Sequence, residues 1–484
     1  MLYRTAKGPQ FSQSKSALQI RGSLNTSSIR NSSMRIFPQL KSPTKSPKQS
    51  LKPLVESKYE LDDVDFSEIN IDIAPPLTQN ANLDLIDMNN LIESVQEPFE
   101  YKLYCHAPES TGVTSEKTFL ISKLYEQVLK NPLISTSDDV LTKIFAIADQ
   151  NIRYKLSSVN EFLFISDYPV YFMLTGIEYI RIWYAIIETY LQKFSFTFNE
   201  NYWKYLIERF KSPVKDEQNL ARDTLLLFFK KFQDQRDFII DEINHIFKSY
   251  KEKVLQHFVV QPALQFLVTI LSQLNQIPSI FFAQSRVIVF PLFITPRVEE
   301  FFDVLSKYSD LFTKKDSTTT LFYIRYLLKH WPITDSHKHI IFLNELHVIL
   351  FSLNPTFFPT ICVPVCSKLF LSVQSSNAKV CTTAFSILGD EGFLSMLIKT
   401  VGFIPTDLER SISTASSSWS EEVKKAAQSA HDILLTIKSK AEQPQQSDFV
   451  QKWKKVARFA NKNYHNEFSD FDNVMSHYSF DFSL

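Results

Sequence analysis

Three residues that could ligate a metal, Asp335, His337 and His339, lie close together in the sequence. Imidazole and carboxylate groups both bind transition metals. The set lacks a fourth ligand, however, and its histidines do not have the i, i+4 spacing that places two of them on one helix face. We therefore interpret these residues as a solvated cap at the start of a helix and expect no metal site.

The four cysteines, Cys105, Cys362, Cys366 and Cys381, fit neither a disulfide framework nor a zinc motif. Cys362 and Cys366 would share one face of a predicted helix, but a zinc site needs a second pair of ligands. We expect reduced, buried cysteines in an intracellular protein. The sequence also contains no G-x-S-x-G, Walker or H-E-x-x-H motif. We therefore expect neither an enzyme nor a bound cofactor.

Basic and aromatic residues alternate in two predicted helices, 216–233 and 236–256, where Arg222, Phe229 and Arg236 are the most informative. Arginine can pair with an acidic or phosphorylated side chain, while a neighbouring aromatic ring accepts an apolar anchor. Two interpretations stay open. Spacing alone favours an ordinary amphipathic helix with a solvated basic edge, and the alternative is a peptide-binding surface.

The elements that would carry these residues are clearest between residues 315 and 355. Asp316 is a good N-cap residue, and apolar residues then recur with the three- and four-residue spacing of one helix face. Pro332 cannot continue that helix. A second apolar helix is predicted to begin near Ser336 and to stop before Asn354. Such a helical hairpin needs neighbours on both sides of its apolar faces, as in a repeat protein.

Glycine is scarce in this chain of 484 residues, 44% of which are hydrophobic. Of its 7 glycines, Gly176 alone lies between Val113 and Leu388. Nucleotide-binding loops and tight β-hairpins depend on glycine, so folds built on them are disfavoured. The chain exceeds the size of one compact core, and its predicted helix pairs recur about every 40 residues, as in HEAT or armadillo repeats. The predicted fold is all-α, a HEAT/armadillo-like solenoid of helical hairpins flanked by disordered N- and C-terminal tails. Outside the hairpin described above, helices are predicted over 116–130, 138–156, 160–174, 177–195, 199–211, 216–233, 236–256, 259–275, 279–293, 297–312, 356–373, 375–388, 390–401 and 417–441.

Charge divides the remainder of the chain. Residues 1–55 carry ten Lys or Arg and no acidic residue, and they are predicted to be a disordered Ser/Pro-rich tail. Residues 56–100 carry twelve acidic residues against Lys58 alone. They are predicted to be a flexible acidic segment that stays solvated, folds back on the basic tail, or orders on a partner. The solenoid is predicted over 101–441, and 442–484 is predicted to be mostly disordered with one optional short helix.

The net charge is zero, which gives no general attraction to nucleic acid. No apolar run reaches the roughly 18 residues of a membrane span. Ser42 and Ser46 each precede a proline and resemble sites for proline-directed kinases, although Ser-Pro pairs are common in disordered tails. We expect a cytoplasmic and/or nuclear protein, and the acid-poor first stretch leaves a mitochondrial transit peptide as the alternative.

Several short stretches resemble the B-prime family of regulatory subunits of protein phosphatase 2A. They are EINHIF at 242–247, FPL at 290–292, KDST at 315–318, LLKHWP at 327–332 and FLNEL at 342–346. The resemblance is clear from Asp216 to Thr400, weaker from Tyr101 to Lys215, and absent in the tails. It implies a HEAT-like solenoid without activity of its own. Such a protein would bind a scaffold subunit and a catalytic serine/threonine phosphatase subunit and select substrates for them.

The resemblance also implies a groove that binds short linear motifs of substrates. Carried over residue by residue, it places Arg222, Phe229 and Arg236 on basic and aromatic groove positions. It places Phe266 and Ile270 on apolar pocket positions. The basic edge noted above is thereby expected to be a peptide site.

Two departures from the family pattern change the expected specificity. Leu226-Leu227 stand where the family has a His-Arg pair that reads an acidic residue, and Phe281 or a neighbour stands where it has a histidine. We expect altered specificity, toward a more apolar motif, with weak binding or none as alternatives. The alternative to a phosphatase subunit is an α-solenoid adaptor in trafficking or nuclear transport, with no phosphatase partner.

Overall fold

The structure, a computed structural model, describes only part of the chain. The described residues are 59, 61, 64, 66, 69, 85–97, 101–104, 115–131, 138–156, 159, 172–174, 176–193, 202–402 and 405–441. All of them belong to one unit of the chain, Lys58–Leu484. The predicted tails at 1–55 and 442–484, with Ser42 and Ser46, lie outside the described residues, as does Cys105.

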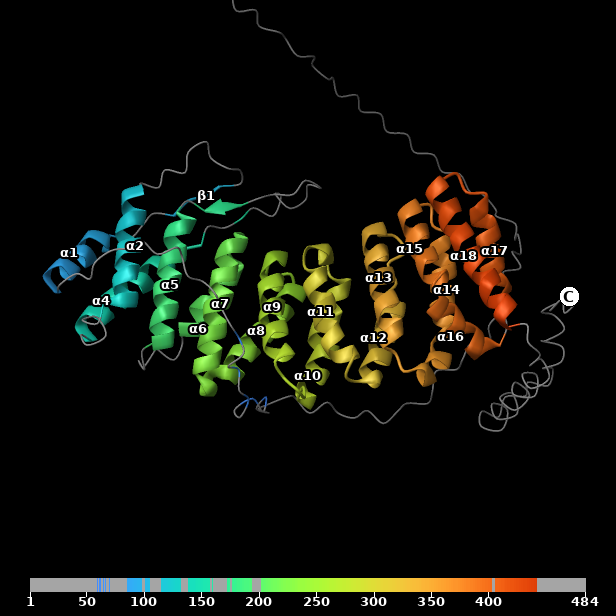
Figure 1. The fold of residues 1–484 in the computed structure, drawn as a ribbon, viewed down its shortest axis with the longest axis horizontal. Helices are drawn as coiled ribbons and strands as arrows, with labels where there is room; N and C mark the ends of the chain where they lie inside the picture. The colour runs from blue at the N-terminus through green and yellow to red at the C-terminus, as the bar shows by residue number, and fades with distance from the viewer. Residues whose placement is uncertain are drawn as a thin grey trace, which may run out of the picture. The chain divides into compact units, whose positions relative to one another are not determined.

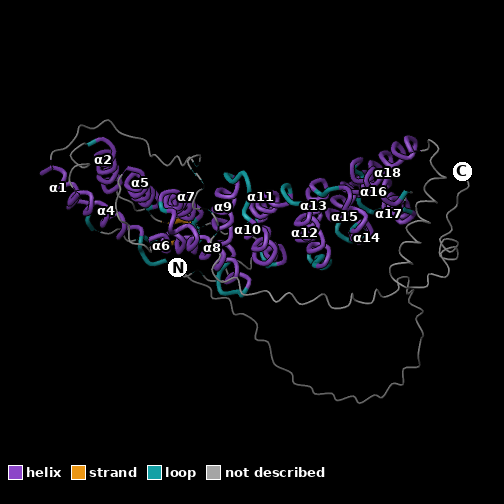
Figure 2. Tube along the Cα trace, turned by 90° about the horizontal axis from the view of Figure 1, so that it is seen from below, coloured by secondary structure: helices purple, strands orange, loops and turns teal. Residues whose placement is uncertain are grey.

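The described part of the chain is helical almost throughout (Figure 2). Its helices are α1 Leu85–Val95, α2 Ser115–Lys130, α4 Asp138–Ile152, α5 Ile177–Lys193, α6 Tyr202–Glu208, α7 Lys215–Lys231, α8 Arg236–Lys251, α9 Val260–Ser272, α10 Ser279–Gln284, α11 Phe302–Thr313, α12 Ser317–Lys329, α13 Ser336–Ser352, α14 Cys362–Val373, α15 Ala378–Leu388, α16 Glu391–Val401, α17 Thr406–Ser416 and α18 Glu421–Ala441. Among the described residues, the strands are β1 Leu103–Tyr104 and β2 Met173–Leu174, which pair antiparallel with Leu103 opposite Leu174.

The helices stack in two layers in chain order. In one layer, each helix packs on the next through α5, α7, α9, α11, α13, α15 and α18 (Figure 1). In the other layer, α6 packs on α8, α12 on α14, and α14 on α17. Helices adjacent in sequence, such as α12 and α13, form the hairpins that join the layers, and one buried apolar cluster runs from Tyr59 to Ile437. This is the predicted all-α solenoid, and the prediction is confirmed.

The hairpin that the sequence defined most clearly forms as predicted. The Asp316 carboxylate accepts the N–H groups of Thr318 and Thr319 at 3.1 and 2.9 Å, and so caps α12. The Asp335 carboxylate accepts the N–H of Lys338 at 3.0 Å and caps α13. Helix α12 ends before Pro332, which has no N–H to continue it. Local sequence rules are therefore sufficient to place this hairpin.

Other predicted elements differ from the structure. The helix predicted at 279–293 is three pieces, α10, a π-helical turn at Ser285–Val289 and a 3-10 helix at Phe290–Ile294. Ser285 donates its hydroxyl to the Phe281 carbonyl at 2.6 Å, and Pro291 lacks a backbone donor, so both disturb regular helical bonding. The helix predicted at 160–174 is wrong at its end, because Met173–Leu174 is β2; its remainder lies outside the described residues.

Two helices were not predicted. Helix α17 was missed because its Ser- and Thr-rich sequence resembles a loop, although Leu408, Ile412 and Ala415 are buried at helical spacing. Helix α1 falls within 56–100, which was predicted to be flexible from its acidic charge. Met88, Leu91, Ile92 and Val95 form its buried face, and it packs on α2 and α4, so helical structure begins before residue 101.

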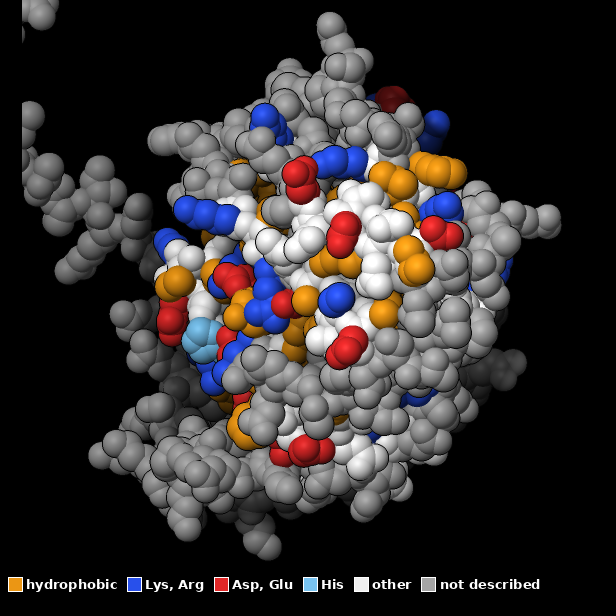
Figure 3. Space-filling model, turned by 90° about the vertical axis from the view of Figure 1, so that its left-hand side faces the viewer, with side chains coloured by type: hydrophobic (Ala, Val, Ile, Leu, Met, Phe, Trp, Pro, Cys, Tyr) orange, Lys and Arg blue, Asp and Glu red, His pale blue; other side chains and the backbone are white. Residues whose placement is uncertain are grey.

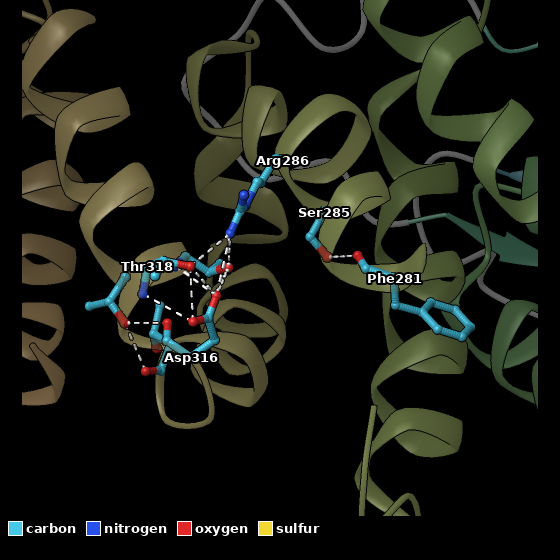
Figure 4. Close-up of polar contacts among 8 residues, drawn as sticks. Phe281, Ser285, Arg286, Asp316 and Thr318 are labelled. Atoms are coloured by element: carbon cyan, nitrogen blue, oxygen red, sulfur yellow. Dashed lines mark hydrogen bonds and ion pairs between the residues drawn. The ribbon is translucent and has the colours of Figure 1, made fainter. Parts of the chain in front are cut away.

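The Asp316 cap also joins two neighbouring hairpins. Arg286, in the π-helical turn, donates from Nη2 to Asp316 Oδ2 and Thr318 Oγ1, both at 3.3 Å, and to Thr319 Oγ1 at 2.6 Å (Figure 4). Burial of Asp316 opposes ionisation, but hydrogen bonds from Thr319 and Thr318 outweigh it and lower the pKa of Asp316 to about 2. The carboxylate is therefore charged at neutral pH, where it acts as helix cap and as partner of Arg286.

Replacing Asp316 with alanine is expected to lower the free energy of unfolding by about 1 kcal/mol, because the first turn of α12 loses its cap. Asp316→Asn keeps a capping oxygen and is the matched control. Since the pKa of Asp316 is lower in the folded chain, its contribution is present above the ordinary pKa of 3.8 and is lost as the pH falls through about 2. Urea unfolding at pH 7 measures the difference, and equal stability of wild type and Asp316→Ala would contradict it.

Candidate functional site

Arg236 begins α8, directly after a short helical turn that follows α7. A positive charge at a helix N-terminus opposes the helix dipole, and Arg236 is also only 2% exposed. Its guanidinium offsets these costs by donating to main-chain carbonyls. Nε reaches Phe229 at 3.1 Å and Nη2 reaches Lys230 at 3.2 Å, while Nη1 reaches Leu61 at 2.6 Å and Val64 at 3.2 Å. Arg236 thus joins the end of α7 to a segment far earlier in the sequence.

Aromatic rings flank this guanidinium. Its central carbon lies 4.7 Å from the ring centroid of Phe66 and 5.4 Å from that of Phe229, within the range of cation–π attraction. The two rings also meet edge to face at 5.2 Å. On the far side, Phe229 meets Phe266 of α9 at 5.5 Å. The buried charge is therefore surrounded by carbonyl oxygens and by ring faces.

Tyr59 is held by a second set of contacts along α8. Its backbone N–H donates to Asp237 Oδ1 at 3.2 Å, and its hydroxyl donates to Asp241 Oδ1 at 2.7 Å. The hydroxyl also accepts from the side-chain amides of Asn244, at 3.1 Å, and Gln284, which uses its one donor and both acceptor positions. Burial and the hydrogen bond to Asp241 raise the pKa of Tyr59 above its ordinary range. Its ring centroid lies 5.1 Å from that of Phe281.

The residues that contact these helices form what we call the 59–69 segment, described at Tyr59, Leu61, Val64, Phe66 and Ile69. All but Val64 are at most 5% exposed, and Val64 packs against the same core. Backbone hydrogen bonds from Val64 to Leu61 and from Ile69 to Phe66, both 3.2 Å, close two turns. These five residues of the predicted flexible acidic segment therefore pack on the chain's own solenoid, and each serves as an apolar anchor.

We call the helical surface under this segment the Arg236 surface; its residues are Phe229, Arg236, Asp237, Asp241, Asn244, Phe281 and Gln284. The structure brings together Phe229, Arg236 and Phe266, and it buries Ile270 one turn beyond Phe266 on α9. That these residues bind a peptide stays a prediction. Arg222 has other partners, since its guanidinium bonds to Asp223 at 2.6 Å and to Gln265 at 2.5 Å.

The sequence did not identify the polar residues of this surface or its occupant. Asp237, Asp241 and Asn244 share one face of α8 at i, i+4 and i+7, but the same spacing occurs on any solvated helix. The available signal was the isolated apolar residues among the acidic ones at 59–69. Leu226 and Leu227, which replace the expected His-Arg pair, are 3% and 8% exposed.

The other residues singled out for chemistry have structural roles. His339, predicted to be solvated, is instead 3% exposed. Its Nε2 lies 2.9 Å from Trp331 Nε1 and 2.7 Å from Ser372 Oγ, and burial lowers its pKa. Cys362 and Cys366 are buried, as predicted. Within the described residues, no group of three or more His, Cys, Asp or Glu could hold a metal ion.

Buried carboxylates also occur, which the sequence did not predict. Glu345 of α13 accepts hydroxyls from Ser306 and Ser309 at 2.6 Å and from Tyr323 at 3.0 Å. Glu188 of α5 accepts the Thr224 hydroxyl of α7 at 2.7 Å. Burial is the largest cause that raises the pKa of each. Each carboxyl binds hydroxyls of neighbouring helices, so these groups join helices within the stack.

The described surface at the α1 and α4 end mixes acidic, basic and apolar side chains without one dominant charge (Figure 3). Such a mixture creates no strong attraction for a charged polymer. Among the helices that the structure describes, none is both long and apolar enough to span a membrane.

Stacked helix pairs that hold a separate segment of chain on their surface are typical of one class, the helical-repeat proteins that bind other chains. Residues 106–466 match the family model described as "Protein phosphatase 2A regulatory B subunit (B56 family)". This is well over half of the chain, and the chain belongs to this family, which is one of regulatory and not catalytic subunits. The match extends beyond residue 441, into a tail where the sequence had shown no resemblance.

Curated relatives agree with this assignment. The chain is 28% identical over 210 residues to the phosphatase 2A 56 kDa regulatory subunit delta 1 isoform of Schizosaccharomyces pombe, covering 43% of this chain and 38% of the relative. It is 26% identical over 198 residues to the B' theta isoform of the 57 kDa regulatory subunit from Arabidopsis thaliana, covering 40% of each. It is 28% identical over 200 residues to the human 56 kDa alpha isoform, covering 41% of each.

The chain therefore spans about two fifths of the length of these relatives. Among solved structures, an engineered protein is similar with a TM-score of 0.31 and 13% identity, covering 71% of this chain and 77% of its own. A likeness at this level carries no weight for the fold or the function.

Proposed function

We propose that this chain is a regulatory subunit of a trimeric serine/threonine protein phosphatase 2A and binds its scaffold and catalytic subunits. The observation that carries the proposal is the family match over residues 106–466, which includes α2 to α18. A stack of helix pairs supports it, because such a stack offers long surfaces to several partners at once.

We further propose that the chain selects substrates through the Arg236 surface. Support comes from how the 59–69 segment is held there. Arg236 bonds to the carbonyls of Leu61 and Val64, which any peptide has, so this contact recognises main chain. Peptides would then be distinguished by their side chains. Apolar side chains would be buried as Phe66 is, and a polar one would bond to the groups around Tyr59.

Affinity purification of the full chain, tagged and expressed in its native cells, tests the first proposal. A helical-repeat scaffold and a metallophosphatase catalytic subunit are expected in the eluate, together with phosphatase activity toward a phosphopeptide. A tag-only preparation is the control. Reproducible absence of both subunits would end the proposal, and other partners in their place would favour the solenoid adaptor.

For localisation we keep the sequence-based proposal of cytoplasm and/or nucleus. Imaging of the full chain with a fluorescent tag at its C-terminus leaves residue 1 unblocked. Exclusive signal in mitochondria would favour the transit-peptide alternative.

A further inference from the structure

We propose that the 59–69 segment is a built-in competitor, which occupies the site that external peptides of the same chemistry would use. Such a peptide binds after the segment leaves. This inference rests on the proposed role of the Arg236 surface in peptide selection. It adds that the surface is controlled by the chain itself.

The segment already fills the Arg236 surface. Tyr59, Leu61 and Phe66 are each at most 2% exposed, so the segment excludes water and other ligands from the places where they lie. The polar groups beneath are used as well, since the Tyr59 hydroxyl bonds to Asp241, Asn244 and Gln284. A second peptide could not make these contacts while the segment remains.

The segment binds in the way that a short peptide can. The anchors recur at i, i+2, i+5 and i+7 through Tyr59, Leu61, Val64 and Phe66, a local pattern that a short peptide can reproduce. Main-chain carbonyls and apolar side chains carry the contacts, as in recognition of linear peptides. Nothing in this set depends on the segment being joined to the solenoid, so a separate peptide can present the same groups.

The covalent link between the segment and the solenoid sets the strength of the competition. Covalent attachment to the solenoid makes binding of the segment intramolecular, with an effective concentration on the order of 1 mM. If the untethered segment binds with a dissociation constant of about 10 μM, the tethered segment would weaken binding of any external peptide about 100-fold.

The contacts also define the chemistry of the competing ligand. It is a peptide whose apolar anchors are separated by mostly acidic residues. Its first anchor is a tyrosine, because that hydroxyl donates to Asp241 and accepts from Asn244 and Gln284. Asp237 lies at the same anchor, bonded to the Tyr59 N–H. A phosphorylated tyrosine would face both carboxylates and be repelled.

A fluorescently labelled synthetic peptide of residues 56–72 tests the proposal by anisotropy, with the purified full chain as receptor. The double variant Tyr59→Ala/Phe66→Ala weakens the internal segment. It is expected to bind the peptide at least 10-fold more tightly than wild type, and adding Arg236→Ala is expected to abolish the gain. The peptide phosphorylated at its tyrosine should bind the double variant at least 10-fold more weakly.

Phe238→Ala is the matched control, since Phe238 is an aromatic residue of α8 that is 60% exposed. This variant should bind the peptide no better than wild type. Equal binding to wild type and the double variant would overturn the proposal, and so would no binding to either.

A second design does not depend on the folding of the alanine variants. A protease site is inserted between residues 72 and 84, and the otherwise native chain is cleaved after purification. Loss of the tether should let the labelled peptide exchange into the site, and the cleaved segment should dissociate. No exchange would overturn the proposal. Both designs use the chain without other subunits. Failure to co-purify a phosphatase would therefore refute the proposed function, and the peptide-binding results would still test the competition by the segment.

Discussion

Arg236→Ala is expected to release the 59–69 segment from the solenoid. The substitution removes a guanidinium that bonds to four main-chain carbonyls and contacts the rings of Phe66 and Phe229. Loss of a buried hydrogen-bonding centre of this kind costs about 3 kcal/mol. Hydrogen exchange at the amides of Val64 and Ile69, which are bonded within the segment, should accelerate on the order of 100-fold.

The matched control for this prediction is Arg222→Ala. Arg222 lies on α7, and its guanidinium bonds to Asp223 and Gln265. Exchange at Val64 and Ile69 should therefore be unchanged in this variant. Arg236→Lys should behave almost like Arg236→Ala, because one ammonium group cannot reach four carbonyls in the same directions. Unaltered exchange in Arg236→Ala would mean that Arg236 does not hold the segment.

Glu188→Gln is expected to stabilise the chain at pH 8. Glu188 is 4% exposed, and its burial raises its pKa to about 8. The hydrogen bond from Thr224 lowers this pKa, and the nearby charge of Asp223 raises it further. The folded chain thus holds this carboxyl protonated in a pH range where the unfolded chain ionises it. Glutamine is neutral at every pH, has almost the same shape, and can still accept the Thr224 hydroxyl.

The direction of the pH dependence follows from the raised pKa. The stability that the protonated Glu188 confers is fully present below the ordinary pKa of 4.5 and is lost as the pH rises through about 8. Across this window the loss is on the order of 4 kcal/mol. Urea unfolding of wild type at pH 5 and pH 8 should show the decline, and Glu188→Gln should reduce it.

Glu178→Gln supplies the control, since Glu178 lies on the same helix and its side chain is 63% exposed, paired with Arg181. Stability of this variant should follow wild type at both pH values. An identical decline in Glu188→Gln and wild type would show that Glu188 is not the group responsible.

Sequence reasoning succeeded where the controlling interactions are local. Asp316 caps α12 because its carboxylate reaches N–H groups two and three residues later, and Pro332 blocks continuation of that helix whatever surrounds it. It failed at α17, where polar composition hid a buried stripe through Leu408 and Ile412. It also failed at His339, which is buried and hydrogen-bonded to Ser372 of another helix.

By itself, the sequence determined a chain of helical hairpins with little glycine; the five positions of a peptide surface were implied by the family resemblance and stay a prediction. The tertiary structure alone decided that Arg236 and not Arg222 meets the 59–69 segment, and that the segment lies on α8 through Tyr59. The physical reason is the distance along the sequence between the residues that interact. A helix is fixed by residues three or four positions apart, whereas contacts between residues separated by most of a domain depend on the path of the whole chain.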